Sequence, residues 1–425
     1  MSFKILLPVS FALAALAFAQ HAPTPDDYHI YAGNTHSHTA YTWSHGEHLA
    51  KSGCSGIEVY GPDPKNPVAY VWTQGYVKTK NGCPGIYVIN GAQIPAPGMP
   101  LKPDWQKYQG PPSEHFRRAK EAGYDFYATT DHSQEGAFQP PSPENPAWLA
   151  VKHEAAAATD SKFLAIAGFE YSENDGPDGK GHINVFNSSD IMNALAPGIG
   201  LQQFYKWLAT AEANGQGPVV ASFNHPGPDQ YNNWDYRTPQ VTDIITMLEV
   251  INSNNKIHYP AFISALDHGW KVSPICGNDN HGFSGITKHT SRTFILATSL
   301  GKVAMLDAMK HRRTYASLDK DIQCRYSVNG EIMGSTLNRP SALKFDVKVS
   351  DPDDKITKLD IVKDGGQVAE VYNPAPASSI HWTPEIKDSA SKYFFVRVWT
   401  GRGGDAPGAD PSKPVAWLAP VWTGR

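Results

Sequence analysis

The stretch NTHSHTAYTWSHG, residues 34–46, brings His36, His38 and His45 together beside the first strand-like run of the chain. In an extended strand, residues i and i+2 point to the same side, so His36 and His38 can direct two imidazoles at one point. That geometry suits a transition metal. A His-x-His pair is weak evidence by itself, so its interpretation depends on where the other candidate ligands fall.

Short apolar runs typical of strands alternate with helical patterns from about residue 113 to residue 316. A helix is expected to begin at Ser113 and to end at Gly123, and a second helical pattern covers residues 201–215. The expected strands are DFYATT (125–130), FLAIAGFE (163–170), INVFN (183–187), PVVASFN (218–224), DIITMLEVI (243–251), SPICGND (273–279) and RTFILA (292–297). This alternation predicts an α/β fold of parallel βαβ units and favours a barrel.

Polar side chains fall at the ends of these strands, and in α/β barrels the strand ends carry the reactive groups. They are Asp131, His132, Glu170, His182, His225, Asp279 and His281, in addition to the three histidines above. Each one alone is explained as a surface or capping residue. Together they predict a metal centre, because burying many imidazoles and carboxylates at one point is costly unless cations compensate them.

These motifs, taken in order, resemble those of the PHP (polymerase and histidinol phosphatase) superfamily of metallohydrolases. The matching residues are His36-x-His38, Ser44-His45-Gly46, Thr130-Asp131-His132, Glu170, His182, His225-Pro226 and Gly277-x-Asp279-x-His281. The resemblance covers residues 30–316 and implies a distorted (β/α)7 barrel, here assigned to residues 20–320. His45 is a departure, because this position is often aspartate in the superfamily.

The resemblance also implies three metal positions. The first is bound by His36, His38, Glu170 and Asp279, the second by Glu170, His182 and His225, and the third by His45, His132 and His281. Asp131 would accept a hydrogen bond from the second ring nitrogen of a ligand. Two or three divalent ions per chain are therefore expected, and zinc, manganese and iron all suit imidazole-rich sites.

Such a centre predicts a hydrolase. Ions about 3.5–4 Å apart would deprotonate a shared water, and this bridging hydroxide would attack an ester. A phosphoester is the favoured small-molecule substrate, because several ions can share its oxygens. Hydrolysis of a carboxylic or carbamic ester is an alternative. A protein that binds glycans or a cell surface is another, but shared carboxylates and open ligand sets argue against a purely structural metal site.

Several other residues have two interpretations. Arg292 and Lys288 either add positive charge for a phosphate or form an ordinary solvated pair, and Glu249 and Asn252 either contact the substrate or cap the following helix. Arg292 and Glu249 therefore join Asp131 as candidate catalytic residues. Three aromatic residues that follow His225 either line the pocket or pack in the interior: Tyr231, Trp234 and Tyr236.

Two regions break the α/β rhythm. Residues 49–112 are rich in glycine, proline and aromatic residues and are interpreted as an insertion. This insertion is either a surface decoration held by a Cys54–Cys83 disulfide or a lid, and a lid would present the aromatic side chains Tyr70, Trp72 and Tyr76. Cys276 and Cys324 either pair or stay reduced. Residues 321–425 alternate with a period of two and predict an antiparallel β-sandwich accessory domain, whose final strands are similar to those of the CehA/McbA-like group.

The charge pattern and the N-terminus bear on partners and location. The net charge of −4, without a block of basic residues, gives no electrostatic indication of a nucleic-acid or anionic membrane partner. Residues 1–19 resemble a secretory signal peptide, and no later run approaches the roughly 20 apolar residues that a membrane span needs. An exported protein, periplasmic or secreted, is therefore expected. The oligomeric state is not indicated.

Overall fold

The computed structural model describes residues 23–42, 46–48, 102–172, 181–194, 196 and 198–425, together with four short strands of the predicted insertion. These strands form two antiparallel pairs, β2 (Ile57–Val59) with β3 (Val77–Thr79), and β4 (Ile86–Ile89) with β5 (Ala92–Pro95). Several predictions lie outside the described residues: the signal peptide, His45, the Cys54–Cys83 disulfide and the side chains of Tyr70, Trp72 and Tyr76.

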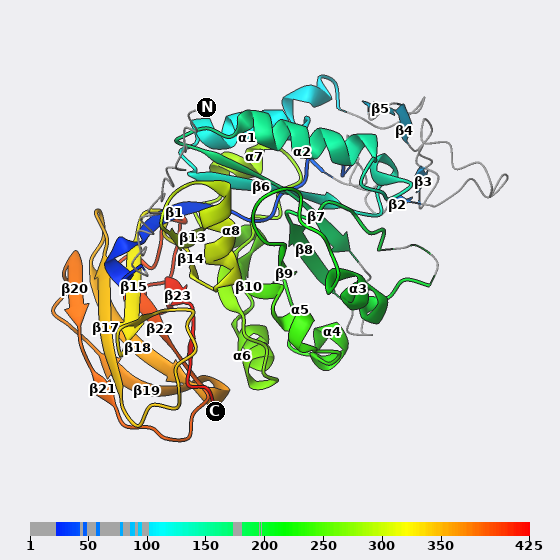
Figure 1. Ribbon diagram of the computed structural model, residues 1–425. Helices are drawn as coiled ribbons and strands as arrows, with labels where there is room; N and C mark the ends of the chain where they lie inside the picture. Colours follow the sequence, from blue (N-terminus) through cyan, green and yellow to red (C-terminus); the bar gives the residue numbers. More distant parts are fainter. Residues whose placement is uncertain are drawn as a thin grey trace, which may run out of the picture.

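A mixed sheet forms the centre of the N-terminal region (Figure 1). Its strands lie in the order β12-β10-β9-β8-β7-β6-β1. Their bounds are β1 (His29–Asn34), β6 (Phe126–His132), β7 (Leu164–Ser172), β8 (His182–Phe186), β9 (Val220–Asn224), β10 (Ile245–Asn252) and β12 (Ser273–Cys276). Each of these strands lies at a run that the sequence analysis expected to be extended.

The direction of β8 corrects the expectation of uniformly parallel strands. Strand β8 runs antiparallel to both β7 and β9, whereas the other neighbouring pairs from β1 to β12 are parallel. Ser172 at the end of β7 pairs with His182 at the start of β8. The connection between them, residues 173–181, is shorter than the dozen or so residues that a parallel crossover requires. A connection of this length is consistent with the antiparallel pairing of β7 and β8.

Helices accompany this sheet. The longer ones are α1 (Pro112–Glu121), α2 (Pro146–Ala158), α3 (Leu201–Leu208), α6 (Tyr259–Asp267), α7 (Phe283–Lys288) and α8 (Lys302–Lys310), and α4 (Gln230–Asn233) and α5 (Pro239–Thr242) are single turns. Helix α1 buries Pro112, His115, Phe116 and Ala119, whose three- and four-residue spacing forms one face. The helix expected at 201–215 ends at Leu208, and Ala213 instead forms a bridge with Ser188. No helix of the described chain is long and apolar enough to cross a membrane.

The two ends of this series of strands meet beyond the regular ladders. Ser37, after β1, forms a parallel bridge with Asn280, after β12. The His38 amide donates to the Asn280 carbonyl at 2.9 Å, and the Asp279 amide donates to the His36 carbonyl at 2.9 Å. The ladders themselves follow an open path that continues from β1 into β13 (Arg292–Ala297) and β14 (Thr314–Ser317). Strand pairing alone therefore does not confirm a closed barrel.

The C-terminal region consists of two antiparallel sheets. One contains β15 (Gln323–Val328), β16 (Glu331–Ile332), β17 (Leu343–Ser350), β20 (Ser379–Trp382) and β21 (Glu385–Ile386). The other contains β18 (Ile356–Lys363), β19 (Gln367–Tyr372), β22 (Tyr393–Thr400), β23 (Ala416–Leu418) and β24 (Val421–Trp422). Side chains of both sheets, including Phe345, Val347, Leu359 and Ile361, share one buried cluster. The period of two in the sequence is thus confirmed as antiparallel strands.

The second of these sheets is continuous with the central sheet. Strand β23 pairs with β14, so one sheet runs across the domain boundary predicted at residue 320 (Figure 1). Strand β22 is buried on both faces. Phe394, Val396 and Val398 point into the C-terminal cluster, whereas Phe395 joins the core of the α/β region and packs 5.4 Å, between ring centroids, from Phe262 of α6. The C-terminal region is therefore packed into the rest of the chain.

Replacing Phe395 with alanine tests this packing. Phe395 is fully buried, so Phe395→Ala should lower the free energy of unfolding by about 3–5 kcal/mol, because it leaves a cavity between α6 and β22. The control is Val371→Ala in β19, where the side chain is 44% exposed and the change should stay within about 0.5 kcal/mol. Urea denaturation followed by fluorescence measures both. Equal stability of the two variants would contradict the packing described.

Candidate metal centre

The candidate ligands come from six separate strand ends. His36 and His38 follow β1, His132 ends β6, Glu170 lies near the end of β7, His225 follows β9, and Asp279 and His281 follow β12. His182 is the first residue of β8, and because β8 is reversed its start lies at the edge where its neighbours end. Their places at strand ends predicted that these residues lie close together, and those that the structure describes do so; His45 lies outside the described residues.

Glu170 lies at the middle of the group. Its carboxylate is 1% exposed. Oε1 lies 3.3 Å from Nε2 of His36, 3.2 Å from Nδ1 of His182 and 3.5 Å from Nε2 of His225. Oε2 lies 3.1 Å from Nε2 of His132. One buried carboxylate thus faces four imidazoles from four strand ends, which is the arrangement expected of a bridging ligand.

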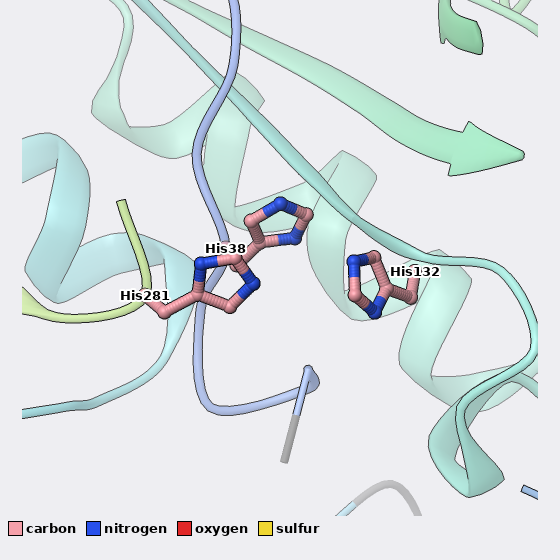
Figure 2. A group of neighbouring side chains, drawn as sticks. All are labelled: His38, His132 and His281. Carbon is pink, nitrogen blue, oxygen red and sulfur yellow. The ribbon is translucent and has the colours of Figure 1, made fainter. Parts of the chain in front are cut away.

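His38 joins the remaining ligands to this carboxylate. Its Nε2 lies 3.0 Å from Oδ1 of Asp279, 3.1 Å from Nε2 of His36 and 3.8 Å from Oε2 of Glu170. Figure 2 shows the His38 ring between the rings of His132 and His281, with centroid distances of 4.5 Å and 4.0 Å. Two fully buried imidazoles that turn nitrogens toward one point and toward carboxylates form a donor set that fits divalent transition metals.

At this centre the ligand residues form three groups, and within each group the ligand atoms lie within 4.8 Å of one another. They are His36, His38 and Glu170; Glu170, His182 and His225; and His38, His132 and His281. The first two agree with the ligand sets that the resemblance implied, and Asp279 lies 3.5 Å from Nε2 of His36 beside the first. In the third group, His38 stands with His132 and His281, where the resemblance placed His45.

Two ligands have left-handed backbone. The φ angle is 31° at His225 and 49° at Asp279. Non-glycine residues avoid this region, and such conformations concentrate at functional sites where the surrounding structure enforces them. Here a hydrogen bond from the His225 amide to Oε2 of Glu249, at 2.7 Å, and one from the Asp279 amide to the His36 carbonyl, at 2.9 Å, hold the two turns.

Glu249 is a supporting residue. It is fully buried, and its Oε1 lies 2.7 Å from Nδ1 of His36. Its Oε2 accepts hydrogen bonds from the His225 amide and from Nδ2 of Asn252, both at 2.7 Å. This carboxylate therefore keeps the proton of His36 on Nδ1 and turns Nε2 toward Glu170. These contacts place Glu249 behind His36 rather than at the start of a helix, and its catalytic role stays a prediction.

Asp131 has a different part from the one the resemblance implied. Its Oδ1 accepts hydrogen bonds from the amides of Thr39, at 2.6 Å, and Thr42, at 3.0 Å, and its Oδ2 accepts one from the Thr39 hydroxyl at 2.8 Å. These hydrogen bonds therefore hold the 39–42 turn, and none of them reaches a ligand ring. Thr42 links this turn to two candidate ligands. Its hydroxyl lies 3.2 Å from Nδ1 of His38 and accepts a hydrogen bond from the His132 amide at 2.9 Å.

Arg292 is held beside Tyr124. Its guanidinium stacks 3.9 Å from the centroid of the Tyr124 ring, and its Nη1 donates to the carbonyls of His289, at 2.8 Å, and Ser291, at 2.9 Å. The side chain is 8% exposed, so the alternative of a solvated pair with Lys288 is corrected. The catalytic role of Arg292 stays a prediction.

The aromatic residues after His225 support the strand ends. The Tyr231 hydroxyl lies 2.8 Å from the carbonyl of His182 and 2.9 Å from that of Asn224, joining β8 to β9. Tyr231 and Trp234 are buried, which favours packing over a pocket wall, whereas Tyr236 is 41% exposed.

Two supporting residues were not predicted. Nδ2 of Asn224 and Oγ of Ser172 donate to Oε1 and Oε2 of Glu170, each at 2.8 Å. Their contact with the site could have been predicted from their positions. Ser172 lies two residues from Glu170 on the same face of its strand, and Asn224 directly precedes His225.

The buried candidate ligands have pKa shifts of both signs. Burial alone would raise the pKa of Glu170, but attraction to His182 and His36 holds that pKa well below its usual range. Burial and repulsion from His132 lower the pKa of His38 to about 4. Burial also lowers the pKa of His225, but a hydrogen bond to Glu170 and attraction to Asp279 outweigh it and raise that pKa to about 9. Near pH 7, Glu170 and His38 are therefore in the forms that bind metals, whereas His225 would release a proton when a metal binds.

Comparisons with known proteins give remote similarities. No protein-family profile and no curated protein matches the chain. Among solved structures, it is similar to a two-domain protein from Bacteroides vulgatus that contains a predicted PHP-like metal-dependent phosphoesterase, with 15% identity, coverage of 94% of this chain and 97% of that chain, and a TM-score of 0.42. It is also similar to a putative metal-dependent phosphoesterase from Bifidobacterium adolescentis. The identity is 12%, the match covers 41% of this chain and 84% of that chain, and the TM-score is 0.24. TM-scores this low do not establish a shared fold, and neither protein bears on the CehA/McbA-like group.

Substitution of Glu249 tests its supporting part. Glu249→Gln removes the charge that holds His36 and one acceptor of the β9 turn, so metal affinity should fall about 10–100-fold, while circular dichroism stays unchanged. Competition with a chromophoric chelator measures the affinity. The control is Glu385→Gln on an exposed position of β21. Affinity equal to that of the wild type would show that Glu249 does not position His36.

Gly277 allows the close approach of Glu249 and His36. A Cβ at this position would lie 1.8 Å from Oε1 of Glu249 and 2.8 Å from Cβ of His36. Gly277→Ala should therefore displace both side chains, lower stability by about 1–3 kcal/mol and weaken metal binding. At Gly301 a Cβ meets Oγ of Ser299 at 3.5 Å, an ordinary contact, so Gly301→Ala is the control. Thermal denaturation and metal analysis distinguish the two, and a Gly277→Ala protein with normal metal content would contradict this account.

Proposed function

We propose that this chain is an exported, multinuclear metal-dependent hydrolase of the PHP superfamily and acts as a phosphoesterase on a small-molecule substrate. The observation that carries the proposal is Glu170, a buried carboxylate faced by four imidazoles at the common edge of β1, β6, β7, β8 and β9. We also propose that the sheet from β1 to β12, joined through Ser37 and Asn280, is the distorted barrel that the resemblance implies.

The proposed division of the ligands follows the one that the resemblance implied, apart from His45, which lies outside the described residues. His36, His38, Glu170 and Asp279 would hold one ion, and Glu170 would share a second with His182 and His225. A third would be held at His132 and His281, with His38 beside them. Zinc, manganese and iron suit these donors. Divalent ions bound here would polarise a phosphoryl oxygen and supply a water nucleophile at neutral pH.

The protein residues orient this centre. Asn224 and Ser172 each donate to one oxygen of Glu170, which fixes the plane of the shared carboxylate. Glu249 fixes the tautomer of His36. These bonds hold the ligands before any ion or substrate arrives, so little reorganisation is required when charge develops in the reaction.

The described chain offers no activated cysteine nucleophile. Cys276 and Cys324 are buried and reduced, and burial raises the pKa of Cys276 to about 12. A thiol with this pKa is protonated near pH 7 and is a poor nucleophile. Attack by water at the metal centre, rather than by a side chain, is the mechanism that these residues support.

The ligands of the site favour phosphoester hydrolysis over the alternative reactions, because they can bind several cations. Arg292 is engaged elsewhere, so the negative charge of a phosphate would be balanced by ions, and a site with several shared carboxylate and imidazole ligands can provide them. Carboxylic and carbamic esters remain the alternative substrates for the same site. The apolar run in residues 1–19 supports the proposal that the protein is exported.

A double substitution tests the function. His36→Ala with His38→Ala removes two ligands of one ion, so metal content should fall by at least one ion per chain and hydrolysis should fall by more than about 100-fold. Elemental analysis gives the metal content, and p-nitrophenyl phosphate, bis-p-nitrophenyl phosphate and p-nitrophenyl acetate report the substrate class.

The matched control is His311→Ala with His381→Ala, whose side chains are each 58% exposed. This control should keep both metal and activity. Unchanged turnover in the folded His36/His38 variant would refute the proposed function, and activity on the acetate ester alone would refute the phosphoester assignment.

A further inference from the structure

Four aspartates meet in the C-terminal region, away from the histidine centre in sequence and in the elements that supply them. Asp319 and Asp321 lie in the connection between β14 and β15, and Asp351 and Asp353 lie in the connection between β17 and β18. One carboxylate oxygen from each lies within 4.8 Å of the others. No imidazole or thiol belongs to this group, so it is an all-oxygen cluster.

The backbone occupies one oxygen of each inner aspartate. Oδ1 of Asp319 accepts from the amides of Asp321 and Ile322, both at 3.0 Å. Oδ1 of Asp351 accepts from the amides of Asp353, at 3.1 Å, and Asp354, at 2.7 Å. The two connections thus have the same local construction, in which one oxygen holds the turn and the other is left over.

The second carboxylate oxygen of each inner aspartate is buried without a hydrogen-bond partner in the described part of the protein. Asp319 is 0% exposed and Asp351 is 1% exposed, and Oδ2 of each has no hydrogen-bond partner among the residues that the structure describes. Oδ1 of Asp321 is also buried without a partner there. Burying a carboxylate oxygen without a partner is strongly unfavourable, whereas a bound cation satisfies it.

The neighbouring basic side chains do not compensate these oxygens. Arg402 pairs with Asp353 at 2.5 Å, on the exposed side of the group, and Lys320 lies 4.0 Å from Asp405. In the described chain, no ion pair reaches Asp319 or Asp351. Burial, together with repulsion from Asp351, Asp405 and Asp321, raises the pKa of Asp319 to about 7. The inner aspartates Asp319 and Asp351 are therefore buried among like charges, without a cationic partner in the part of the chain that the structure describes.

We propose that these aspartates form a calcium site. Calcium takes six to eight oxygen ligands at about 2.3–2.6 Å in flexible geometry, so oxygens on opposite sides of the ion stand about 4.6–5.2 Å apart. The four oxygens of this group all lie within 4.8 Å of one another, so they can share one such ion. Magnesium, at about 2.0–2.1 Å, requires a tighter octahedron and keeps several waters. Zinc and copper prefer imidazole or thiolate ligands.

The position of the site indicates its effect. Strand β14 belongs to the sheet that crosses from the α/β region, β15 and β17 belong to the separate C-terminal sheet, and β18 lies in the sheet that continues from β14 through β23. An ion between the β14–β15 and β17–β18 connections would link both sheets where the chain passes between them. Calcium binding should therefore stabilise the folded protein rather than take part in hydrolysis.

Thermal unfolding of the full-length protein in calcium-depleted buffer, with its transition metals retained, tests the proposal. Adding millimolar CaCl2 should raise Tm by several degrees, since an ion that binds the folded state stabilises it. Equilibrium dialysis should find about one Ca²⁺ bound per chain, with a dissociation constant in the range of other calcium sites built from oxygen ligands. MgCl2 at the same concentration should give a smaller rise. No binding and no rise would overturn the proposal.

Asp319→Asn is the discriminating variant. Its amide oxygen can still accept from Asp321 and Ile322, while an NH2 group replaces Oδ2. Without calcium, Tm should be equal to or above that of the wild type, because repulsion is relieved, and the calcium-induced rise should disappear. Asp351→Asn repeats the test at the other connection if the first variant folds poorly. The control is Asp346→Asn, a partly exposed position in β17, which should respond to calcium as the wild type does.

These outcomes are separate from those for the proposed function. Asp319→Asn and Asp351→Asn should keep hydrolysis and transition-metal content, and the His36/His38 double variant should keep the calcium response. A calcium-induced rise that persists in both aspartate variants would place the ion elsewhere and overturn the site.

Discussion

The α/β region buries one ionised carboxylate, and the arrangement of its strand ends depends on compensating that charge. Glu170 is almost fully buried in the sheet, and a carboxylate there is tolerated only if other groups face it closely. Imidazoles from β1, β6, β8 and β9 and the donors Asn224 and Ser172 meet this requirement. The requirement extends outward, since Glu249 holds His36 and Asp131 shapes the turn whose Thr42 contacts His38. The left-handed backbone at His225 and Asp279 is tolerated because these bonds and the neighbouring strands leave little alternative.

Much of this centre was predictable because each ligand directly adjoins an apolar run, and strand ends of an α/β sheet gather at one edge. The supporting residues were harder to assign. Glu249 and Asp131 also stand at or near strand ends, but which ring or amide a carboxylate reaches depends on the neighbour across the sheet, and local sequence does not encode that neighbour. Arg292 illustrates the same limit: its place after the Asp279 loop suggested substrate binding, whereas the ring of Tyr124, distant in sequence, engages it.

The C-terminal strands were recognisable from their period of two, but their partners were not. The pairing of β14 with β23 joins residues about a hundred positions apart, and no pattern within either strand specifies that contact. The reversal of β8 lies between these cases. A histidine at the start of a strand, where its companions stand at the ends of theirs, was a visible sign that this strand runs the other way.

The sheet that crosses residue 320 has a consequence for how this region can be exchanged between proteins. A recombinant graft that began at residue 321 would lack β14 and leave the edge of β23 uncovered, and unpaired strand edges promote association with other chains. Exchange would succeed more readily if the donor segment carried its own β14 and the part of α6 that packs against Phe395 of β22. The segment that can be transferred as one folding unit is therefore larger than residues 321–425, where the alternating pattern occurs.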